Sequence, residues 1–442
     1  MNSFSLLALT VPAKPSALTP PPCRPCLSPS RPAARYEIQM EMAAALPSSW
    51  EELSPDLLGL VLHRLPSLAD RVRLRAVCRP WRAGAAARRH LLLPAPLPWL
   101  ALLLDGTLVD FHGAPVRCAP ILREGVFRYL AVDNLAFLVH DDGRCSLVNP
   151  LSGLTLHLPK FVPDVRRALQ NLPNPQSFVP RTHSKVIVSS PLGLMPDPLV
   201  ASKVRDGRSL DFSPCKDHDA ISVRLRRETR IMRISDIAFV HGELYAVNFY
   251  EGLHVLKLDA SHLGKPKSPS GFQLRIAEDR EQQQIYNYGD DPSYYVLRYL
   301  AESNGRLLMV RRWMSIPQKA QLGYHEKTVQ FEVFEADLTS TPGKWTKVDN
   351  LGGQALFIGT QCTKSLLASQ CAGGVQEDSI YFMHRACDKP FSEYSGLCVD
   401  PLGDSGVYNM RDGKITPFLP EPVMAELQRK QKSLTWFFPT DA

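Results

Sequence analysis

Two short groups of cysteine, histidine and aspartate residues are the places in this sequence where metal chemistry could be expected. Cys23 and Cys26 form a lone CxxC pair, which is half of the ligand set that a structural zinc site needs, and no second pair or histidine lies nearby. Cys215 stands two residues before an Asp-His-Asp run at 217–219, in a polar stretch without apolar support. The CxxC pair lies in a proline-rich stretch and is a weak signal for a zinc or redox site, and the 215–219 group is interpreted as a solvated loop, so no metal and no cofactor is predicted.

Paired carboxylates, which can serve as a general acid and base, occur at Asp141-Asp142 and Asp290-Asp291. Both pairs stand in turn contexts, where aspartate side chains bond to nearby backbone groups. The sequence also has no Gly-rich phosphate loop, no HExxH motif and no GxSxG motif. Acids that converge from distant segments leave no signature in sequence spacing, so a hydrolase stays open as an alternative. The local pattern predicts no catalytic residue.

The composition is that of an ordinary globular chain, and its 442 residues are enough for two or three domains. The longest apolar stretch, around residues 91–104, is interrupted by prolines and is shorter than the about 18 residues of a membrane helix. The net charge of +7 is mild, and the arginine cluster at 224–233 is interpreted as a solvated strand or loop, so neither a membrane nor a nucleic acid is predicted as a partner. The ten scattered cysteines favour reduced thiols.

Two helical patterns lie close together in residues 54–82. In the first, apolar residues at 57, 58, 61, 62 and 65 form one broad face, Ser54 can cap the helix, and Pro55 suits its first position. In the second, residues 74, 77, 78 and 81 share an apolar face, and Pro80 is expected to break the helix near Cys78. So small a unit does not bury this much leucine by itself, so its faces need a partner, either the next domain or another protein.

These helices resemble the F-box pattern, especially as it occurs in plant proteins. The match rests on Trp50, Leu53, Asp56, Leu57, Leu58, Leu65-Pro66, Asp70, Arg73, Val77, Cys78, Trp81 and Arg82. The usual first Leu-Pro reads Leu53-Ser54 here, with the proline one place later at Pro55. An F-box is a small helical module that docks on a Skp-type linker protein and, through it, on a cullin.

The resemblance implies a set of linker-binding residues and no catalytic, cofactor-binding or metal-binding residue. The implied linker-binding residues are Leu53, Pro55, Leu57, Leu58, Val61, Leu62, Leu65, Arg73, Val77, Cys78 and Trp81.

From about residue 100 short apolar runs bounded by turn residues replace the helical period. The pattern predicts three-strand meanders at 137–158 and 236–258, a hairpin at 295–312, strands at 329–334, 345–348, 355–358, 380–383, 406–409 and 415–418, and a helix at 424–432. Four-strand sheets that recur every roughly 40–50 residues are typical of a β-propeller, which closes radially and so protects its edge strands. A pair of β-sandwich domains is the alternative.

The second half also resembles the kelch-like, KIB-type propeller of plant F-box proteins. The matching segments are 236–239, 242–246, 299–303, 305–312, 331–334, 345–348, 351–353, 356–359, 378–382, 406–410 and 412–413. Residues 160–233 match poorly, an insertion or distortion within them is one interpretation, and the number of blades stays open. The expected fold class is mainly β: a small N-terminal α-helical F-box followed by a β-propeller.

The expected domain organisation follows from these segments. It comprises a disordered Pro/Ser/Arg-rich leader at 1–45, the F-box at 46–90, a linker at 91–99, the propeller at 100–420, and a tail at 421–442 that is a candidate for propeller closure. The leader has no acidic residue before Glu37, and in this it also resembles a plastid transit peptide. A further interpretation is an upstream extension that translation from Met40 or Met42 would omit.

The two resemblances together imply the substrate-recognition subunit of an SCF-type ubiquitin ligase. The F-box would dock a Skp-type linker and thereby cullin, and the propeller would hold a target protein in the cytoplasm or nucleus. Such a subunit raises the effective concentration of its target and catalyses nothing itself. The alternatives are a regulatory F-box adaptor that does not lead to degradation and a propeller hydrolase.

Overall fold

The computed structural model describes Trp50 and most of the chain after residue 52. The described residues are 50, 53–65, 67–87, 93, 95–102, 106–110, 113–116, 120–158, 183–190, 198–204, 210–214, 221–223, 226–227, 230–256, 272–279, 293–316, 327–371, 374–383, 402–429 and 434–440. The chain divides into two compact units, Met1–Trp50 and Glu51–Ala442, and every element below belongs to the second. The predicted leader at 1–45 lies outside the described residues.

The first three elements form a small group of helices that we call the helical module. Its helices are α1 (Pro55–Arg64), α2 (Leu68–Ala76) and α3 (Arg79–Ala87). Ser54 is the N-cap of α1, where its hydroxyl accepts a hydrogen bond from the backbone N–H of Leu57 at 3.4 Å. Pro80 stands in the first turn of α3, a position that tolerates its missing N–H, so the predicted break near Cys78 is confirmed and Trp81 belongs to a new helix.

The three helices pack around a core of their own. Its buried members are Leu58, Leu62, Leu74 and Ala85. Gly84 lets α3 approach α1 closely, because a Cβ built on it would lie 3.1 Å from a methyl carbon of Leu58. Arg71 of α2 is fully buried, and its Nε donates a hydrogen bond to the backbone carbonyl of Leu65 at 2.9 Å.

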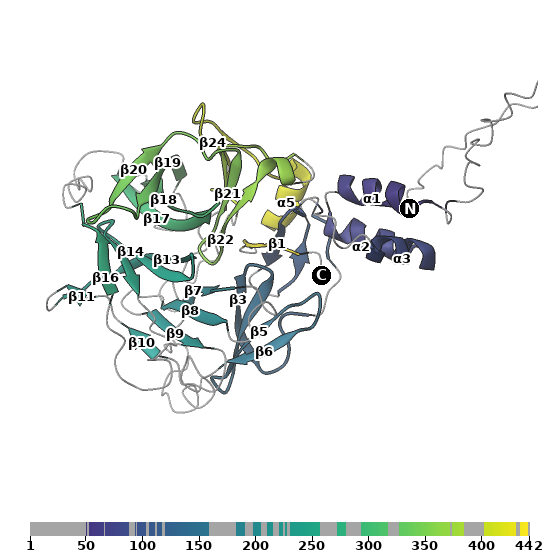
Figure 1. The fold of residues 1–442 in the computed structure, drawn as a ribbon, viewed down its shortest axis with the longest axis horizontal. Helices are drawn as coiled ribbons and strands as arrows, with labels where there is room; N and C mark the ends of the chain where they lie inside the picture. Colours follow the sequence, from purple (N-terminus) through teal and green to yellow (C-terminus); the bar gives the residue numbers. More distant parts are fainter. Residues whose placement is uncertain are drawn as a thin grey trace, which may run out of the picture. The chain divides into compact units, whose positions relative to one another are not determined.

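Six sheets surround a common axis after the helical module, which makes the fold a six-bladed β-propeller (Figure 1). Blades 1 to 4 are antiparallel meanders whose first strands lie side by side around the axis. Blade 1 consists of β3 (Val126–Val132), β4 (Leu135–His140), β5 (Cys145–Val148) and β6 (Thr155–Leu158), and blade 2 of β7 (His183–Val188), β8 (Leu199–Val204), β9 (Leu210–Pro214) and β10 (Ile221–Val223). Blade 3 consists of β13 (Ile234–Val240), β14 (Glu243–Asn248), β15 (Leu253–Leu256) and β16 (Phe272–Ile276), and blade 4 of β17 (Ser293–Ser303), β18 (Arg306–Ile316), β19 (Lys327–Asp337) and β20 (Lys344–Val348).

Blade 5 departs from the meander. Its strands are β21 (Gln354–Ile358), β22 (Thr363–Leu367), β23 (Ser379–Phe382), β24 (Gly406–Asn409) and β25 (Ile415–Thr416), with a short 3-10 helix η5 (Ala368–Gln370) after β22. In space their order is β22-β21-β23-β24-β25, so β21 pairs in parallel with β23, and β22 contacts β17 of blade 4. The innermost strand of this blade is therefore its second strand in sequence.

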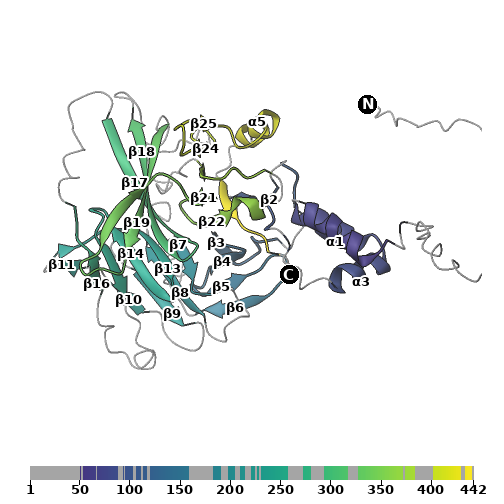
Figure 2. The same cartoon turned by 45° about the horizontal axis from the view of Figure 1, so that its top comes forward.

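Blade 6 joins the two ends of the propeller. It consists of β1 (Trp99–Leu102), β2 (Leu108–Val109) and β26 (Leu434–Phe437), and β26 follows the last helix α5 (Glu421–Arg429). Strand β1 pairs antiparallel with β26, so that Leu100 lies opposite Trp436 (Figures 1 and 2). A C-terminal strand therefore closes the ring by pairing with a strand from its start.

Every predicted strand is present in the described residues, and the predicted C-terminal helix is present as α5, which begins three residues earlier than predicted; residues 257–258 and 430–432 of these predictions lie outside the described part. The described part of the poorly matching stretch at 160–233 forms blade 2 of the propeller. Its apolar alternation is hidden by buried polar residues, among them Lys185, Ser202 and Asp211. The arginine cluster contributes a two-stranded ribbon of β11 (Arg226–Arg227) and β12 (Arg230–Ile231). The β-sandwich alternative is wrong.

The propeller core lies between neighbouring blades. Leu130 and Phe137 of blade 1 pack with Val186 and Val200 of blade 2, for example. Strands that are covered on both faces read as continuous apolar runs, and Leu135–Val139 is such a run. Among the described residues no helix is long and apolar enough to span a bilayer.

Candidate functional site

The helical module exposes a row of apolar side chains along α1. Leu57, Leu60 and Val61 are 49%, 59% and 40% exposed. Their spacing of i, i+3 and i+4 places them on one face of the helix. The opposite face carries Leu58 and Leu62, which are each 1% exposed and fill the core of the module. We call the exposed row of Leu57, Leu60 and Val61 the α1 face.

This geometry divides the predicted linker-binding residues into two groups. Leu58 and Leu62 are each 1% exposed, so the structure places these two predicted residues inside the module and not on its surface. Leu53, Leu65 and Trp81 are half-buried against the same core. The predicted residues that present themselves to solvent are Pro55, Leu57, Val61, Arg73 and Val77, with Cys78 intermediate.

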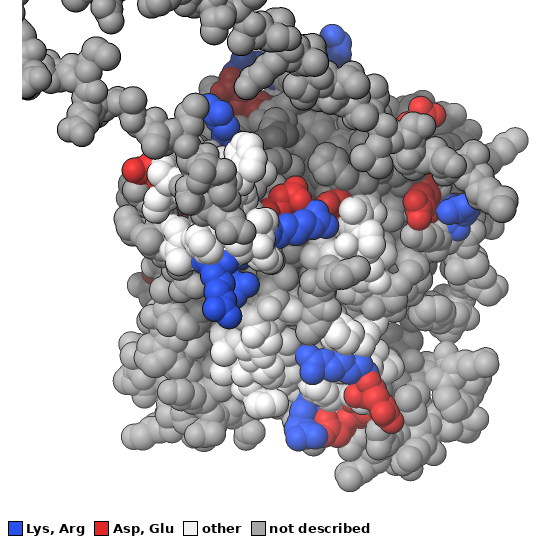
Figure 3. Space-filling view, turned by 90° about the vertical axis from the view of Figure 1, so that its right-hand side faces the viewer, with Lys and Arg blue, Asp and Glu red and all other residues white. Residues whose placement is uncertain are grey.

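Charge around the helical module is mixed in sign. Arg73 pairs with Asp70 across one turn of α2, with the donor nitrogen and acceptor oxygen 2.7 Å apart, and both side chains are exposed. An exposed pair of this kind contributes little to stability. On the face drawn in Figure 3, lysine and arginine side chains alternate with acidic ones among uncharged residues. The described part of that face therefore shows no large patch of like charge.

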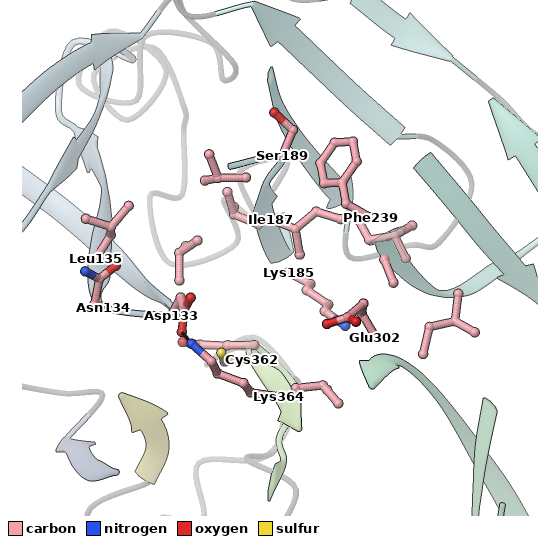
Figure 4. A pocket seen from close by; sticks show the side chains of 18 of the residues that line it. Asp133, Asn134, Leu135, Lys185, Ile187, Ser189, Phe239, Glu302, Cys362 and Lys364 are labelled. Atoms are coloured by element: carbon pink, nitrogen blue, oxygen red, sulfur yellow. Dashed lines mark hydrogen bonds and ion pairs between the residues drawn. The ribbon is translucent and has the colours of Figure 1, made fainter. Parts of the chain in front are cut away.

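A second candidate site is a cavity at the axis of the propeller, which we call the channel cavity. Its volume is about 260 Å³. The lining comes from the end of β3 and the following turn, from β7, β13 and β17, and from the residues that lead into β22. Figure 4 shows Ile187, Ser189 and Phe239 on one side, with Glu302 and the Asp133–Lys364 pair on the other.

Both lysines of the channel cavity are already paired with carboxylates. Lys185 Nζ lies 2.8 Å from Asp236 Oδ2, and both side chains are almost fully buried. The same oxygen of Asp236 accepts a hydrogen bond from the backbone N–H of Leu300 at 2.7 Å, so this carboxylate joins β7, β13 and β17. At the opposite wall, Lys364 Nζ forms an ion pair with Asp133.

The chemistry of the channel cavity is polar rather than nucleophilic. Burial, assisted by the charge of Asp133, raises the pKa of the Cys362 thiol to about 12, so at neutral pH this sulfur is protonated and unreactive. The part of the chain that the structure describes contains no group of three or more histidine, cysteine or acidic side chains placed to hold a metal ion.

Several residues that the sequence offered as candidates for catalysis or ligand binding have structural roles instead, and others lie outside the described residues. Asp142 accepts a hydrogen bond from the backbone N–H of Arg144 at 3.0 Å, which is the turn role predicted for it. Gly352 and Gly353 have φ of +67° and +78°, which glycine adopts without strain, and Asp378 accepts from the backbone N–H of Gly353. Cys23, Cys26, the 215–219 group and Asp290-Asp291 lie outside the described residues.

Sequence reasoning did not find the channel cavity. Its charged residues are spread from Asp133 to Lys364 and meet only because the blades close into a ring. A polar residue inside an apolar strand was the available signal, since Lys185 and Asp236 are buried and stand beside the buried apolar residues Val186 and Ile237.

Comparison with known proteins agrees with this architecture. The family model described as the KIB1-4 beta-propeller matches residues 125–409, from the turn before β3 to the end of β24. The F-box protein At2g26160 of Arabidopsis thaliana is 24% identical over 353 residues, which cover 76% of this chain and 95% of the relative. The F-box protein At2g14290 of the same plant is 24% identical over 414 residues, which cover 90% and 99%.

Solved structures are matched only distantly. YCF48 from Cyanidioschyzon merolae is 13% identical, with a TM-score of 0.27, over 57% of this chain and 69% of that one. A likeness this weak adds nothing to the fold. The family model, in contrast, covers well over half of the chain and ends within the blades that the structure forms. This chain therefore belongs to the KIB1-4 β-propeller family and has the architecture of a plant F-box protein, a helical module followed by a propeller.

Proposed function

We propose that this protein is the substrate-recognition subunit of an SCF-type ubiquitin ligase. The helical module binds a Skp-type linker, the linker joins it to cullin, and the propeller binds a target protein. The proposal is supported by the F-box names of the relatives and by the order of the two domains. The protein works in the cytosol or nucleus, where the cullin machinery is present.

The α1 face is the observation that carries this proposal. Leu57, Leu60 and Val61 project from one side of a helix whose other side is already packed, so folding of the module does not require them. Burying a single exposed leucine in an interface contributes about 1.5–3 kcal/mol. Three adjacent aliphatic side chains therefore suit the apolar centre of a protein–protein contact.

The proposed mechanism is proximity. A target held by the propeller stays beside a ubiquitin-charged enzyme, so its effective concentration there rises without catalytic residues in this chain. The channel cavity is consistent with a binding role, because its cysteine is protonated and its lysines are engaged in ion pairs.

A binding experiment with purified Skp-type linker tests the docking step. The variant Leu57→Asp/Val61→Asp places two charges on the α1 face, which would be buried without partners in the complex. We expect the full-length wild type to bind and the variant to lose at least 100-fold in affinity, with unchanged thermal unfolding. Leu154→Asp/Ile415→Asp is the matched control, because these propeller residues are 50% and 40% exposed. It should bind like the wild type.

The outcomes separate docking from ligase function. Equal binding by the Leu57→Asp/Val61→Asp variant and the wild type would place the linker elsewhere and refute the α1 face. A wild type that binds the linker but does not enter a complex with cullin on size-exclusion chromatography would contradict the ligase assignment. That second result would favour a regulatory F-box adaptor instead.

A further inference from the structure

We propose that the channel cavity receives one basic side chain, an arginine or a lysine, from the protein that the propeller binds. The inference deepens the proposed function, on which it rests for the existence of a protein target. It assigns the cavity as the recognition site and names the chemistry that the target presents.

The charge balance of the channel cavity points to a cation. Lys185 is neutralised by Asp236 and Lys364 by Asp133, so the two lysines offer no free positive charge to a ligand. Glu302 also lines the cavity and is exposed to solvent. Among the described residues its only hydrogen-bond partner is the backbone N–H of Gly305, at 2.7 Å, and no cation is paired with it. One carboxylate is therefore left for a positively charged group.

The shape of the channel cavity fits a single long side chain. Its volume of about 260 Å³ lies below the range of roughly 300–1,000 Å³ that is usual for pockets of small-molecule ligands. Ile187 and Phe239 are half-buried and form an apolar wall opposite Glu302 (Figure 4). Arginine and lysine combine an apolar stem with a charged end, so the stem can lie along this wall while the end reaches the carboxylate.

A second polar group in the lining lacks a partner. The hydroxyl of Ser190 is buried, and it has no hydrogen bond in the described structure. A buried hydroxyl without a hydrogen bond is unfavourable, so an incoming group that donates to it or accepts from it would relieve it. Guanidinium and ammonium can both donate to its oxygen, so this hydroxyl is compatible with a basic side chain, while the preference for a cation rests on Glu302.

The test uses the full-length protein and a panel of blocked pentapeptides, Gly-Gly-X-Gly-Gly, in which X is arginine, lysine, glutamate or leucine. Affinities are measured by ligand-observed NMR titration at low and high salt. We expect the arginine and lysine peptides to bind at least fivefold more tightly than the other two, and their affinity to fall as salt rises. Spermidine is included as a free polyamine that carries charge without a peptide backbone.

Three variants locate the binding. Glu302→Gln keeps an oxygen for the N–H of Gly305 and removes the charge, so the affinity for the arginine peptide should fall at least fivefold. Glu302→Lys should reverse the preference in favour of the glutamate peptide. Glu124→Gln is the matched control, because Glu124 is exposed and does not line the cavity; it should bind like the wild type.

The inference is overturned by any of four results. These are equal binding of all four peptides, tighter binding of the glutamate peptide, unchanged affinity of Glu302→Gln for the arginine peptide, and spermidine binding as tightly as the peptide. The Leu57→Asp/Val61→Asp variant should bind the arginine peptide normally. Failure of the peptide test and failure of linker docking are therefore distinguishable.

Discussion

Leu57 and Leu58 are neighbours in the chain and have opposite roles. Leu57 is about half exposed on the α1 face, whereas Leu58 packs against Leu62 and Leu74 inside the helical module. A helix turns by about 100° per residue, so adjacent positions on a broad apolar stripe can face different neighbours. The resemblance to the F-box pattern assigned both residues to linker binding, and burial separates them.

A pair of single substitutions tests this division. Leu58→Asp buries an unpaired charge and should destabilise the helical module by several kcal/mol, enough to unfold it. Leu57→Asp lies at the surface and should change the free energy of unfolding by about 0.5 kcal/mol or less. Far-UV circular dichroism and urea unfolding of both variants measure the difference. Similar loss of helix in both would contradict the assigned burial.

His254 is a single residue that makes the stability of the fold depend on pH. Burial lowers its pKa to about 4 from 6.5. Its Nε2 lies 3.3 Å from the amide nitrogen of Asn248, whose other amide hydrogen is directed to Glu278, so the neutral ring is the form that can accept a bond there. A base whose pKa is lower in the folded state stabilises the fold above the unfolded pKa, and this stability is lost as pH falls from 6.5 to about 4.

Replacement of His254 by glutamine should remove that sensitivity. The two pKa values correspond to a limit of about 3 kcal/mol. Between pH 7 and pH 4, the free energy of unfolding in urea should therefore fall by about 1–3 kcal/mol less in His254→Gln than in the wild type. His157→Gln, at an exposed position on β6, is the control and should follow the wild type. Parallel pH profiles for all three proteins would refute the role of His254.

At the scale of elements, one carboxylate connects the inner strands of three blades. Asp236 on β13 binds the ammonium of Lys185 on β7 and the backbone N–H of Leu300 on β17. Because the pair is buried, removal of one partner leaves a charge without compensation, which is typically unfavourable by about 3–5 kcal/mol. Other polar contacts also cross between blades, such as the ion pair of Lys364 with Asp133, so the Lys185–Asp236 pair is one of several that hold neighbouring blades together.

A double-mutant cycle tests the connection. Asp236→Asn keeps an acceptor for the N–H of Leu300 but leaves Lys185 unpaired, and we expect a loss of about 3–5 kcal/mol in the free energy of unfolding. Lys185→Met combined with Asp236→Asn removes both charges and should recover at least half of that loss. The measurement is chemical denaturation of the full chain. Additive losses in the double variant would show that the two side chains are not coupled.

At the scale of the whole molecule, stability depends on closure between residues that are more than 300 positions apart. The indole of Trp436 on β26 is fully buried, donates a hydrogen bond to the carbonyl of Ile358 at 3.0 Å, and packs edge-on against Phe357. Strand β26 also carries the pairing with β1. The last strand thus holds blades 5 and 6 together.

Trp436→Ala should therefore destabilise the propeller as a whole. The cavity that it leaves is expected to lower the free energy of unfolding by about 3–5 kcal/mol, with a matching fall in the melting temperature. Phe127→Ala, at an exposed position on β3, is the control and should lose much less. If calorimetry gave equal melting temperatures for the two variants, closure through β26 would not limit stability.

The sequence alone determined the elements whose signals are local. The cap at Ser54, the break before Pro80 and the turns at Gly143 and Gly242, which both adopt positive φ, depend on residues a few positions apart. Alternation and turn chemistry therefore located the predicted strands, and the propeller resemblance agrees with the family model that matches residues 125–409. Blade 2 was missed because buried polar residues such as Lys185 interrupt its apolar pattern.

Tertiary structure alone decided the features that join distant segments. The parallel pairing of β21 with β23, the pairing of β1 with β26, and the hydrogen bond from Ala131 to Gln361 link residues that carry no mutual signal in sequence. The tertiary structure also decided that the side chain of Leu58 is buried, and it formed the channel cavity, which Glu302, Phe239 and Ile187 line together. Local periodicity specifies that a face is apolar or that a strand forms. Which segment that face or strand packs against depends on how the ring of blades closes.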